Sequence, residues 1–464
     1  MDYSNCGCSR RQMVRSLISG SILLPGILSQ LLGDTAHAAV SGSDAENPLA
    51  PKSPHFPPKA KRVIFLYMSG GVSHMDSFDP KPRLVKDAEA GALSPGGRPY
   101  MRPLWDFKPR GKCGTEVSEL FPHIGECMDD ICLIRSMRGD HNDHFQATMG
   151  IHTGSVTFKR PSIGSWVSYG LGTENQNLPS FVVLAPQLPY AGSQVWSSDF
   201  LPGAHQGTSV SSGAEPVPNL NRRAASAQIQ QRELSLLERF NRKHLAERAT
   251  DPVLTARIKS FETAFGMQRE TPEVLDLSKE TDATLALYGL ERGSSQGVAW
   301  QCLVARRLAE RGVRFIELID SGSSKNWDAH GDMKTHEPLA RNVDKPIAGL
   351  LKDLKSRGML EDTLVVWTTE FGRTPVIDGP TGRSHHSNAF SSWMAGGGVK
   401  GGVAYGRTDD YGGKVIENEV HVHDFHATIL HLLGFDHEKI TFRHAGRDFR
   451  LTDVHGKVIQ ALLA

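Results

Sequence analysis

A run of apolar and β-branched residues at positions 363–369, TLVVWTT, constrains the fold more than any other stretch of the chain. It lacks the alternation of a half-exposed strand, which is typical of a strand inside a parallel sheet covered on both faces. Glu370 follows directly, and a Gly- and Pro-containing loop then leads to His385 and His386. In open α/β sheets, functional groups lie beyond the carboxyl ends of the strands. We therefore expect the functional site at this strand end.

Similar apolar runs alternate with helical patterns along the chain, which predicts an α/β fold. Core strands are expected at 62–68, 131–136, 179–184, 313–319 and 363–369, and a shorter strand is expected at 389–394. Helices are expected at 116–128, 144–152, 163–169, 228–248, 252–265, 296–311, 339–357 and 424–433. This order indicates a mostly parallel sheet with helices on both faces. His426 and His431 are expected on the surface of the last helix.

The N-terminal segment is predicted to be a targeting signal. SRRQMV at 9–14 resembles a twin-arginine export motif, and Ala36-His37-Ala38 has the pattern of a cleavage site. The apolar stretch at 17–32 is short and rich in Ser and Gly, so no stable membrane span is expected in the mature chain. The alternatives are an uncleaved anchor or a chance Arg pair. We expect export to the periplasm or the extracellular space.

The remaining residues predict a linker at 39–61, which is rich in Pro and Ser, and one domain at 62–464. The formal net charge of +1 gives no reason to expect a nucleic-acid partner. An H-E-x-x-H peptidase motif is absent from the sequence, and the triple glycine at 396–398 lacks the Lys-Ser/Thr of a phosphate-binding loop.

Polar clusters follow at least four of the predicted strands. They are Asp76 and Asp79, the DHNDH sequence at 140–144, Asp328 and His330, and Glu370 with His385 and His386. The first three have simpler explanations. Asp76 suits a helix N-cap and Asp79 a turn, the 140–144 sequence suits a solvated loop with a helix cap, and Asp328 and His330 suit a loop with turn-forming residues. Metal ligands, however, are usually collected from several loops, and carboxylate with imidazole suits zinc or manganese better than calcium. The convergence of the clusters predicts a divalent metal site.

Four motifs carry a resemblance to a known superfamily. They are MSGGVSHMDSFD, HFQATMGIHTG, VVWTTEFGR and DFHATILHLLG, spread over residues 62–435. Together they resemble the alkaline phosphatase/sulfatase superfamily and, within it, a secreted bacterial family of unknown function whose members are often labelled sulfatase-like. The resemblance implies an alkaline-phosphatase-like three-layer sandwich and a metal-dependent hydrolase of sulfate or phosphate esters. An anionic ester or a sulfated glycan would then be the substrate.

The chain departs from the superfamily pattern at the positions that carry chemistry. His144 stands at the nucleophile position, and no C/S-x-P-x-R sequence occurs after residue 38. Glu370-Phe-Gly replaces the usual Asp-His-Gly, so the resemblance implies that His385 or His386 replaces one histidine ligand. Ser69 stands where a metal-binding Asp is usual, and Asp76 is its expected replacement.

The hypothesis assigns a role to each candidate residue. The expected ligands of a divalent ion are Asp76, Asp328, His330, Glu370, His385 and His386. His144 is expected to act as a general acid and base or as the nucleophile, and Arg373 is expected to hold the anionic group. The competing interpretation is a non-catalytic exported protein that keeps the fold, has lost the site and binds a glycan or an envelope partner.

Overall fold

A nine-stranded sheet forms the centre of the protein, for which a computed structural model describes residues 47–213, 216–218, 220, 226–246 and 252–464. Across the sheet lie β12 (Val403–Tyr405), β4 (Ile131–Arg138), β11 (Phe390–Ala395), β8 (Thr363–Thr368), β1 (Arg62–Tyr67), β7 (Phe315–Ile319), β5 (Phe181–Leu184) and β6 (Thr208–Val210). β15 (Val420–His421) pairs with β4. The predicted leader at 1–38 and the first part of the predicted linker lie outside the described residues.

The sheet is mostly parallel. β8, β1, β7, β5 and β6 pair in parallel, while β11 runs antiparallel to both β8 and β4. Parallel strands need crossover connections, which here are the helices. The predicted α/β class with a mostly parallel sheet is therefore confirmed.

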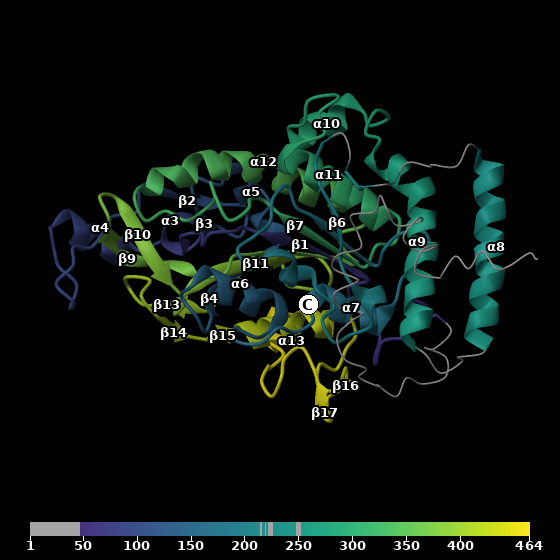
Figure 1. Ribbon diagram of the computed structural model, residues 1–464. Helices are drawn as coiled ribbons and strands as arrows, with labels where there is room; N and C mark the ends of the chain where they lie inside the picture. Colours follow the sequence, from purple (N-terminus) through teal and green to yellow (C-terminus); the bar gives the residue numbers. More distant parts are fainter. Residues whose placement is uncertain (1–46, 214–215, 219, 221–225, 247–251) are drawn as a thin grey trace, which may run out of the picture.

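Helices cover both faces of the sheet, which gives three layers (Figure 1). α11 (Gly297–Glu310) and α12 (His336–Ser356) lie on one face, and α6 (His144–Thr153), α7 (Ile163–Leu171) and α13 (Val422–Leu432) lie on the other. The side chains of β1 alternate between the two hydrophobic cores, with Ile64 and Leu66 in one and Phe65 and Tyr67 in the other. Both cores are fully buried around the central strands.

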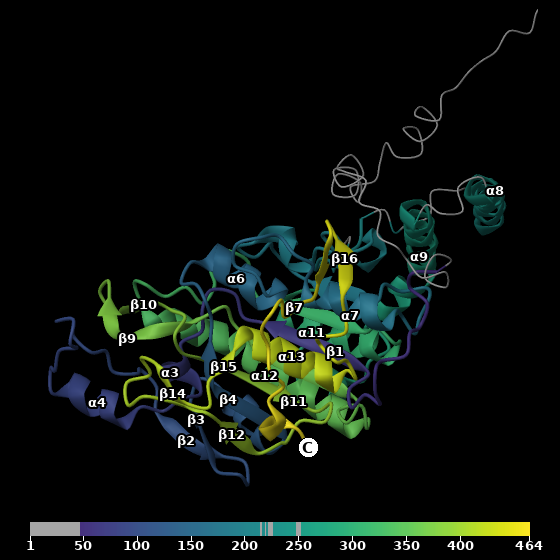
Figure 2. The same ribbon diagram turned by 90° about the horizontal axis from the view of Figure 1, so that it is seen from below.

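Further helices and strands surround these layers. The helices are α3 (His74–Ser77), α4 (Pro82–Glu89), α5 (Pro122–Gly125), α8 (Ala227–Ala246), α9 (Pro252–Leu275) and α10 (Asp282–Tyr288). The outer strands are β2 (Phe107–Arg110), β3 (Thr115–Ser118), β9 (Gly372–Asp378), β10 (Gly382–His386), β13 (Arg407–Thr408), β14 (Val415–Glu417), β16 (Phe442–His444) and β17 (Arg447–Phe449). Both views place α8 beyond α9 at the edge of the molecule (Figures 1 and 2). None of the described helices is both long and apolar enough to span a membrane.

Two predicted segments differ from the structure. The helix expected at 116–128 is instead the strand β3, the short helix α5 and a 3-10 turn, because Pro122 begins a new helix after the strand has ended. The loop expected after residue 370 contains the hairpin of β9 and β10, which forms a separate two-stranded sheet. This hairpin matters for the site because it carries Arg373 and His385.

Candidate metal centre

The candidate site lies beyond the carboxyl ends of the neighbouring strands β7, β1 and β8. Asp328 and His330 lie in the loop after β7, and Glu370 lies two residues beyond the end of β8. His144 is the first residue of α6, and His385 lies on β10. The parallel order of the strands thus brings together residues that are more than 200 positions apart in the sequence.

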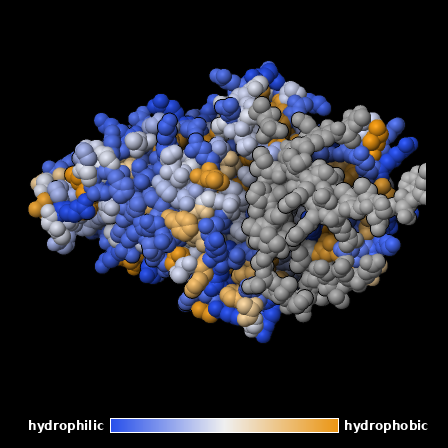
Figure 3. All heavy atoms as spheres, in the orientation of Figure 1, coloured by the Kyte–Doolittle hydropathy of each residue, from blue (hydrophilic) through white to orange (hydrophobic). Residues whose placement is uncertain are grey.

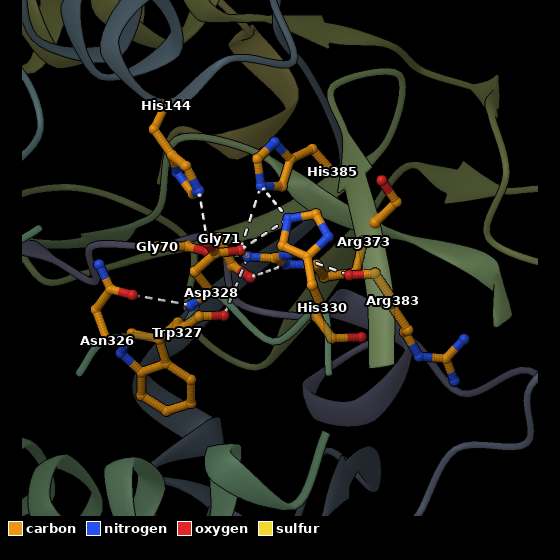
Figure 4. Close-up of polar contacts among 12 residues, drawn as sticks. Gly70, Gly71, His144, Asn326, Trp327, Asp328, His330, Arg373, Arg383 and His385 are labelled. Carbon is orange, nitrogen blue, oxygen red and sulfur yellow. Dashed lines mark hydrogen bonds and ion pairs between the residues drawn. The ribbon is translucent and has the colours of Figure 1, made fainter. Parts of the chain in front are cut away.

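The carboxylate of Asp328 is the centre of the cluster (Figure 4). Its Oδ2 lies 3.3 Å from Nε2 of His144, and its Oδ1 lies 3.2 Å from Nε2 of both His330 and His385. The same Oδ1 accepts a hydrogen bond of 2.9 Å from Arg373. Burial raises the pKa of Asp328, but the bonds from His144 and His385 and the charge of Arg373 outweigh this and hold it well below its usual range.

Each of the three imidazoles also has its Nδ1 atom against a hydrogen-bond acceptor. The pairs are His144 with Glu370 Oε1 at 2.8 Å, His330 with Asp378 Oδ2 at 2.6 Å, and His385 with the main-chain oxygen of Asn142 at 2.7 Å. In a neutral imidazole whose Nδ1 proton is directed at such an acceptor, Nε2 carries a lone pair, whereas in a protonated ring Nε2 donates to Asp328. The neutral form is the arrangement of metal-binding histidines, whose second nitrogen usually donates to a carboxylate or a carbonyl.

The contact between His330 and His385 also points to a cation. Their Nε2 atoms lie 2.8 Å apart, and both Nδ1 protons are already directed at acceptors. Two lone pairs at this distance repel each other unless a proton or a metal ion lies between them. His144, Asp328 and His385 together offer three possible ligand atoms within 4.8 Å of one another. The donor set therefore fits a divalent metal ion.

Glu370 lies behind His144 and is almost fully buried. Its Oε1 accepts from His144 and from the amide of Gly70, and its Oε2 accepts from the hydroxyl of Tyr67. Burial raises the pKa of Glu370, but the hydrogen bond and charge of His144 outweigh it, so the net shift is downward. Burial likewise lowers the pKa of His144, while Asp328 and Glu370 raise it by more. Glu370 thus orients an imidazole and does not face the shared centre.

Arg373 is fully buried and is bonded to the loops that follow β1 and β7. Its guanidinium donates to the carbonyls of Gly70, Gly71, Trp327 and Arg383 and to Asp328. Each of its three nitrogens donates to a main-chain oxygen, and Nη2 also donates to the carboxylate of Asp328. In this structure Arg373 therefore positions Asp328, whereas the sequence hypothesis assigned it to an anionic ligand.

Two of the predicted ligands lie apart from Asp328. Asp76 is fully buried, and its Oδ2 forms an ion pair of 2.9 Å with Arg383 and accepts from the hydroxyl of Ser73. His386 faces the opposite side of β10 from His385, because successive side chains of a strand alternate, and its Nε2 lies 2.6 Å from Gly413 O. The structure thus brings Asp328, His330, His385 and His144 together, with Glu370 and Arg373 supporting them.

A second group, formed by Asp140, His421 and His423, has ligand atoms equally close to one another. Here the backbone N–H of His423 donates to Nδ1 of His421, whose Nε2 lies 2.8 Å from Asp140 Oδ1. Nε2 therefore carries the proton, which is the opposite of the arrangement around Asp328. His421 caps α13, and this group is better explained as a helix terminus.

Residues 60–463 match a protein-family model described as a protein of unknown function, DUF1501. The chain belongs to this family. The match covers the central sheet, the candidate ligands and both layers of helices, so the residues around Asp328 lie within the part of the chain that defines the family. No curated protein matches the sequence.

Several solved structures are similar to this DUF1501 chain at low sequence identity. The lipoteichoic acid synthase LtaP from Listeria monocytogenes has a TM-score of 0.36 and 8% identity, covering 86% of this chain and 79% of its own. The PsFucS1 sulfatase from Pseudoalteromonas sp. has a TM-score of 0.34 and 12% identity, covering 82% and 68%. The alkaline phosphatase from the Antarctic bacterium TAB5 has a TM-score of 0.32 and 12% identity, covering 73% and 92%. Similarity at this level identifies no activity for the DUF1501 chain.

Three residues of the site were missed by the sequence hypothesis. Asp378 and Asn142 hold two of the imidazoles, and Tyr190 stacks on His144 with ring centroids 4.0 Å apart and an angle of 5° between the planes. Asp378 and Asn142 lie in the polar segments that the sequence singled out, where their proximity to histidines was the available signal. Tyr190 lies in a loop after β5 and carries no such signal.

Proposed function

We propose that this protein is an exported metal-dependent hydrolase of anionic esters, either sulfate or phosphate esters. One observation carries the proposal: the Nε2 atoms of three histidines face one carboxylate, and each ring is fixed through its Nδ1 atom. The proposed ligands are Asp328, His330, His385 and His144. Glu370, Asp378 and the carbonyl of Asn142 support them.

The charge of the cluster agrees with a divalent ion. Asp328, Glu370 and Asp378 contribute three negative charges, and Arg373 and Arg98, which pairs with Asp378, contribute two positive charges, so one negative charge remains when the imidazoles are neutral. Imidazole with carboxylate suits zinc, manganese or iron, whereas calcium prefers oxygen ligands. Such an ion would polarise an ester oxygen and lower the pKa of a bound water toward ~7.

The protein's own residues would provide orientation. Glu370 holds His144, and Arg373 fixes Asp328 together with the carbonyls of Gly70 and Gly71. Because Arg373 and Glu370 are buried and hydrogen-bonded, the ligand loops are positioned before any substrate arrives. His144 takes the position of a ligand in this proposal, which leaves neither of its nitrogens free to act as a nucleophile.

The first test is elemental analysis of the protein purified without chelator. We expect one or more equivalents of zinc, manganese or iron in the wild type and in His386→Ala, and a loss of metal in His330→Ala. Only His330 faces Asp328, whereas Nε2 of His386 lies 2.6 Å from the carbonyl oxygen of Gly413. Retention of metal in His330→Ala would contradict the proposed ligand set.

The second test is hydrolysis by the metal-containing protein. A panel of aryl sulfates, phosphate monoesters and phosphate diesters would be compared with and without a chelator. We expect turnover of at least one class, abolished by chelation and in Asp328→Asn. A protein without metal and without turnover would support the alternative, a non-catalytic binding protein. One observation favours this alternative: the side chain of Arg373 is buried and already bonded to Asp328, so it is not available to bind an anionic substrate.

A further inference from the structure

A tyrosine beside the candidate metal centre holds a hydroxyl group in a defined orientation. Tyr190 lies in the loop after β5, and its ring stacks on the imidazole of His144 at 4.0 Å. Its hydroxyl oxygen lies 3.0 Å from Nδ2 of Asn326. Asn326 is two residues before Asp328, so Tyr190 contacts both a proposed ligand and the loop that carries the central carboxylate.

The orientation of the Asn326 amide follows from its main-chain partners. Its Oδ1 accepts from the backbone N–H of Asp328 at 3.1 Å, and its Nδ2 donates to the carbonyl of Gly322 at 2.9 Å. A rotated amide would place its NH₂ group against an N–H and its oxygen against a carbonyl, so this orientation is fixed. Nδ2 must then donate to the oxygen of Tyr190.

The hydroxyl proton of Tyr190 is consequently directed away from Asn326. A hydroxyl oxygen that accepts from Nδ2 has its own proton available for a different acceptor. No acceptor for this proton is found among the described residues. The side chains of Tyr190 and Asp328 are both half-buried. The result is an oriented hydrogen-bond donor next to the metal ligands.

We propose that the hydroxyl of Tyr190 donates a hydrogen bond to an oxygen of the tetrahedral anionic group of the substrate. The inference rests on the proposed function, because it needs an oxyanion at the centre around Asp328. It assigns the donor role to Tyr190, while the guanidinium of Arg373 is already bonded to carbonyls and to Asp328. A preorganised donor of this kind recognises an oxyanion without rearrangement of the site.

The test compares Tyr190→Phe with the wild type, since phenylalanine keeps the stacking on His144 and removes only the hydroxyl. Tyr169→Phe is the matched control, because the hydroxyl of Tyr169 donates to the carbonyl of Thr441, away from the cluster. Metal content would be measured first and is expected to be equal in all three proteins. Tungstate, a tetrahedral oxyanion, would then be titrated into each metal-containing protein by calorimetry.

We expect the tungstate dissociation constant to rise about tenfold in Tyr190→Phe and to stay unchanged in Tyr169→Phe, as for the loss of one hydrogen bond to a charged group. The kcat/KM for the best ester should fall by a similar factor. Equal affinity of Tyr190→Phe and wild type for tungstate, with equal metal content, would overturn the inference while the hydrolase proposal stands. A wild type that binds metal but neither binds tungstate nor cleaves any ester would overturn the proposed function itself.

Discussion

At the scale of single residues, Asp328 organises the site because its two oxygens contact three imidazoles and a guanidinium. A carboxylate this heavily contacted is costly to bury without positive charge around it. Some of the surrounding groups face Asp328 directly, namely the three imidazoles, and others, such as Glu370, hold these imidazoles in place. This division gives different predictions for the two kinds of residue.

Glu370→Gln is expected to weaken metal binding without abolishing it. The glutamine can still accept from Gly70, but it no longer provides the charge that fixes the Nδ1 proton of His144. We expect the metal dissociation constant to rise roughly 10- to 100-fold, as is usual when the partner of a ligating histidine is changed. Competition with a chromophoric chelator would measure this. Complete loss of metal would show that Glu370 is itself a ligand, as the sequence hypothesis held.

Arg373→Lys is expected to destabilise the protein although the charge is kept. An ammonium cannot reach the four carbonyls and the Asp328 carboxylate that the planar guanidinium bonds at once. We expect a loss of about 3 kcal/mol in the free energy of unfolding by urea, as for other disrupted buried ion pairs. Arg98→Lys is the control, because Arg98 forms an exposed ion pair with Asp378. This variant should change the free energy of unfolding by less than about 1 kcal/mol. Equal effects of both variants would contradict this account.

The residue types at the site could be predicted from the sequence, but their partners could not. Asp76 looked like a ligand because nothing in the sequence reveals that Arg383, 307 positions later, neutralises it. His385 and His386 could not be distinguished, because side chains alternate only along a strand and the sequence predicts a loop in this segment. Ion pairing and strand alternation both arise only when the chain has folded.

At the scale of elements, the hairpin of β9 and β10 packs against the loop that carries Asp328 and His330. Gly382 on β10 has no room for a side chain, because a Cβ there would lie 1.9 Å from the carbonyl oxygen of His330. The backbone of β10 also bonds to this loop, with the N–H of Arg383 donating to the carbonyl of Ala329 at 3.0 Å. The hairpin therefore sets the distance between His385 and the two ligands of the loop.

Gly382→Ala is expected to separate the hairpin from the loop. The added methyl group must displace backbone atoms, so we expect a loss of about 2 kcal/mol or more in the free energy of unfolding together with weaker metal binding. Gly331→Ala is the control, since a Cβ at this neighbouring position meets no atom within 4 Å. Chelator competition and urea unfolding would be measured on both. Unchanged metal affinity in Gly382→Ala would show that the hairpin does not position the ligands.

The central strands were predictable because their apolar runs are long and lack alternation, as in β8 and β1. Elements outside the sheet were predicted less well. β9 contains a proline and no apolar pattern, and its pairing with β10 is stabilised by contacts with distant loops. Local sequence gives little information on such a strand, since its burial depends on tertiary packing.

At the scale of the whole molecule, two hydrophobic cores lie on either side of the sheet and enclose several histidines. The face seen in Figure 3 is mainly hydrophilic, with scattered apolar groups. His205 and His426 are nearly inaccessible, and His426 lies in the core beside α6, where its Nε2 donates to the carbonyl of Ile151. The expectation that His426 lies on the helix surface is therefore wrong, because α13 is buried on the side that faces α6.

These buried histidines predict that the protein loses stability as the pH falls. Burial lowers the pKa of His205 and of His426 from 6.5 to about 3. The unfolded chain therefore binds more protons than the folded protein between these values, and the stabilisation present above pH 6.5 is lost progressively toward pH 3. At pH 5 each histidine should cost about 2 kcal/mol of the free energy of unfolding.

Urea unfolding at pH 7.5 and pH 5, with a chelator present so that metal release does not contribute, would measure this loss. His426→Gln keeps a donor for the carbonyl of Ile151 but cannot be protonated, so the difference between the two pH values should shrink by about 2 kcal/mol. His141→Gln, in a partly exposed loop, is the control and should leave the difference unchanged. Wild-type stability that is equal at both pH values would contradict the prediction, because it would mean that the cores accommodate protonated histidines without opening.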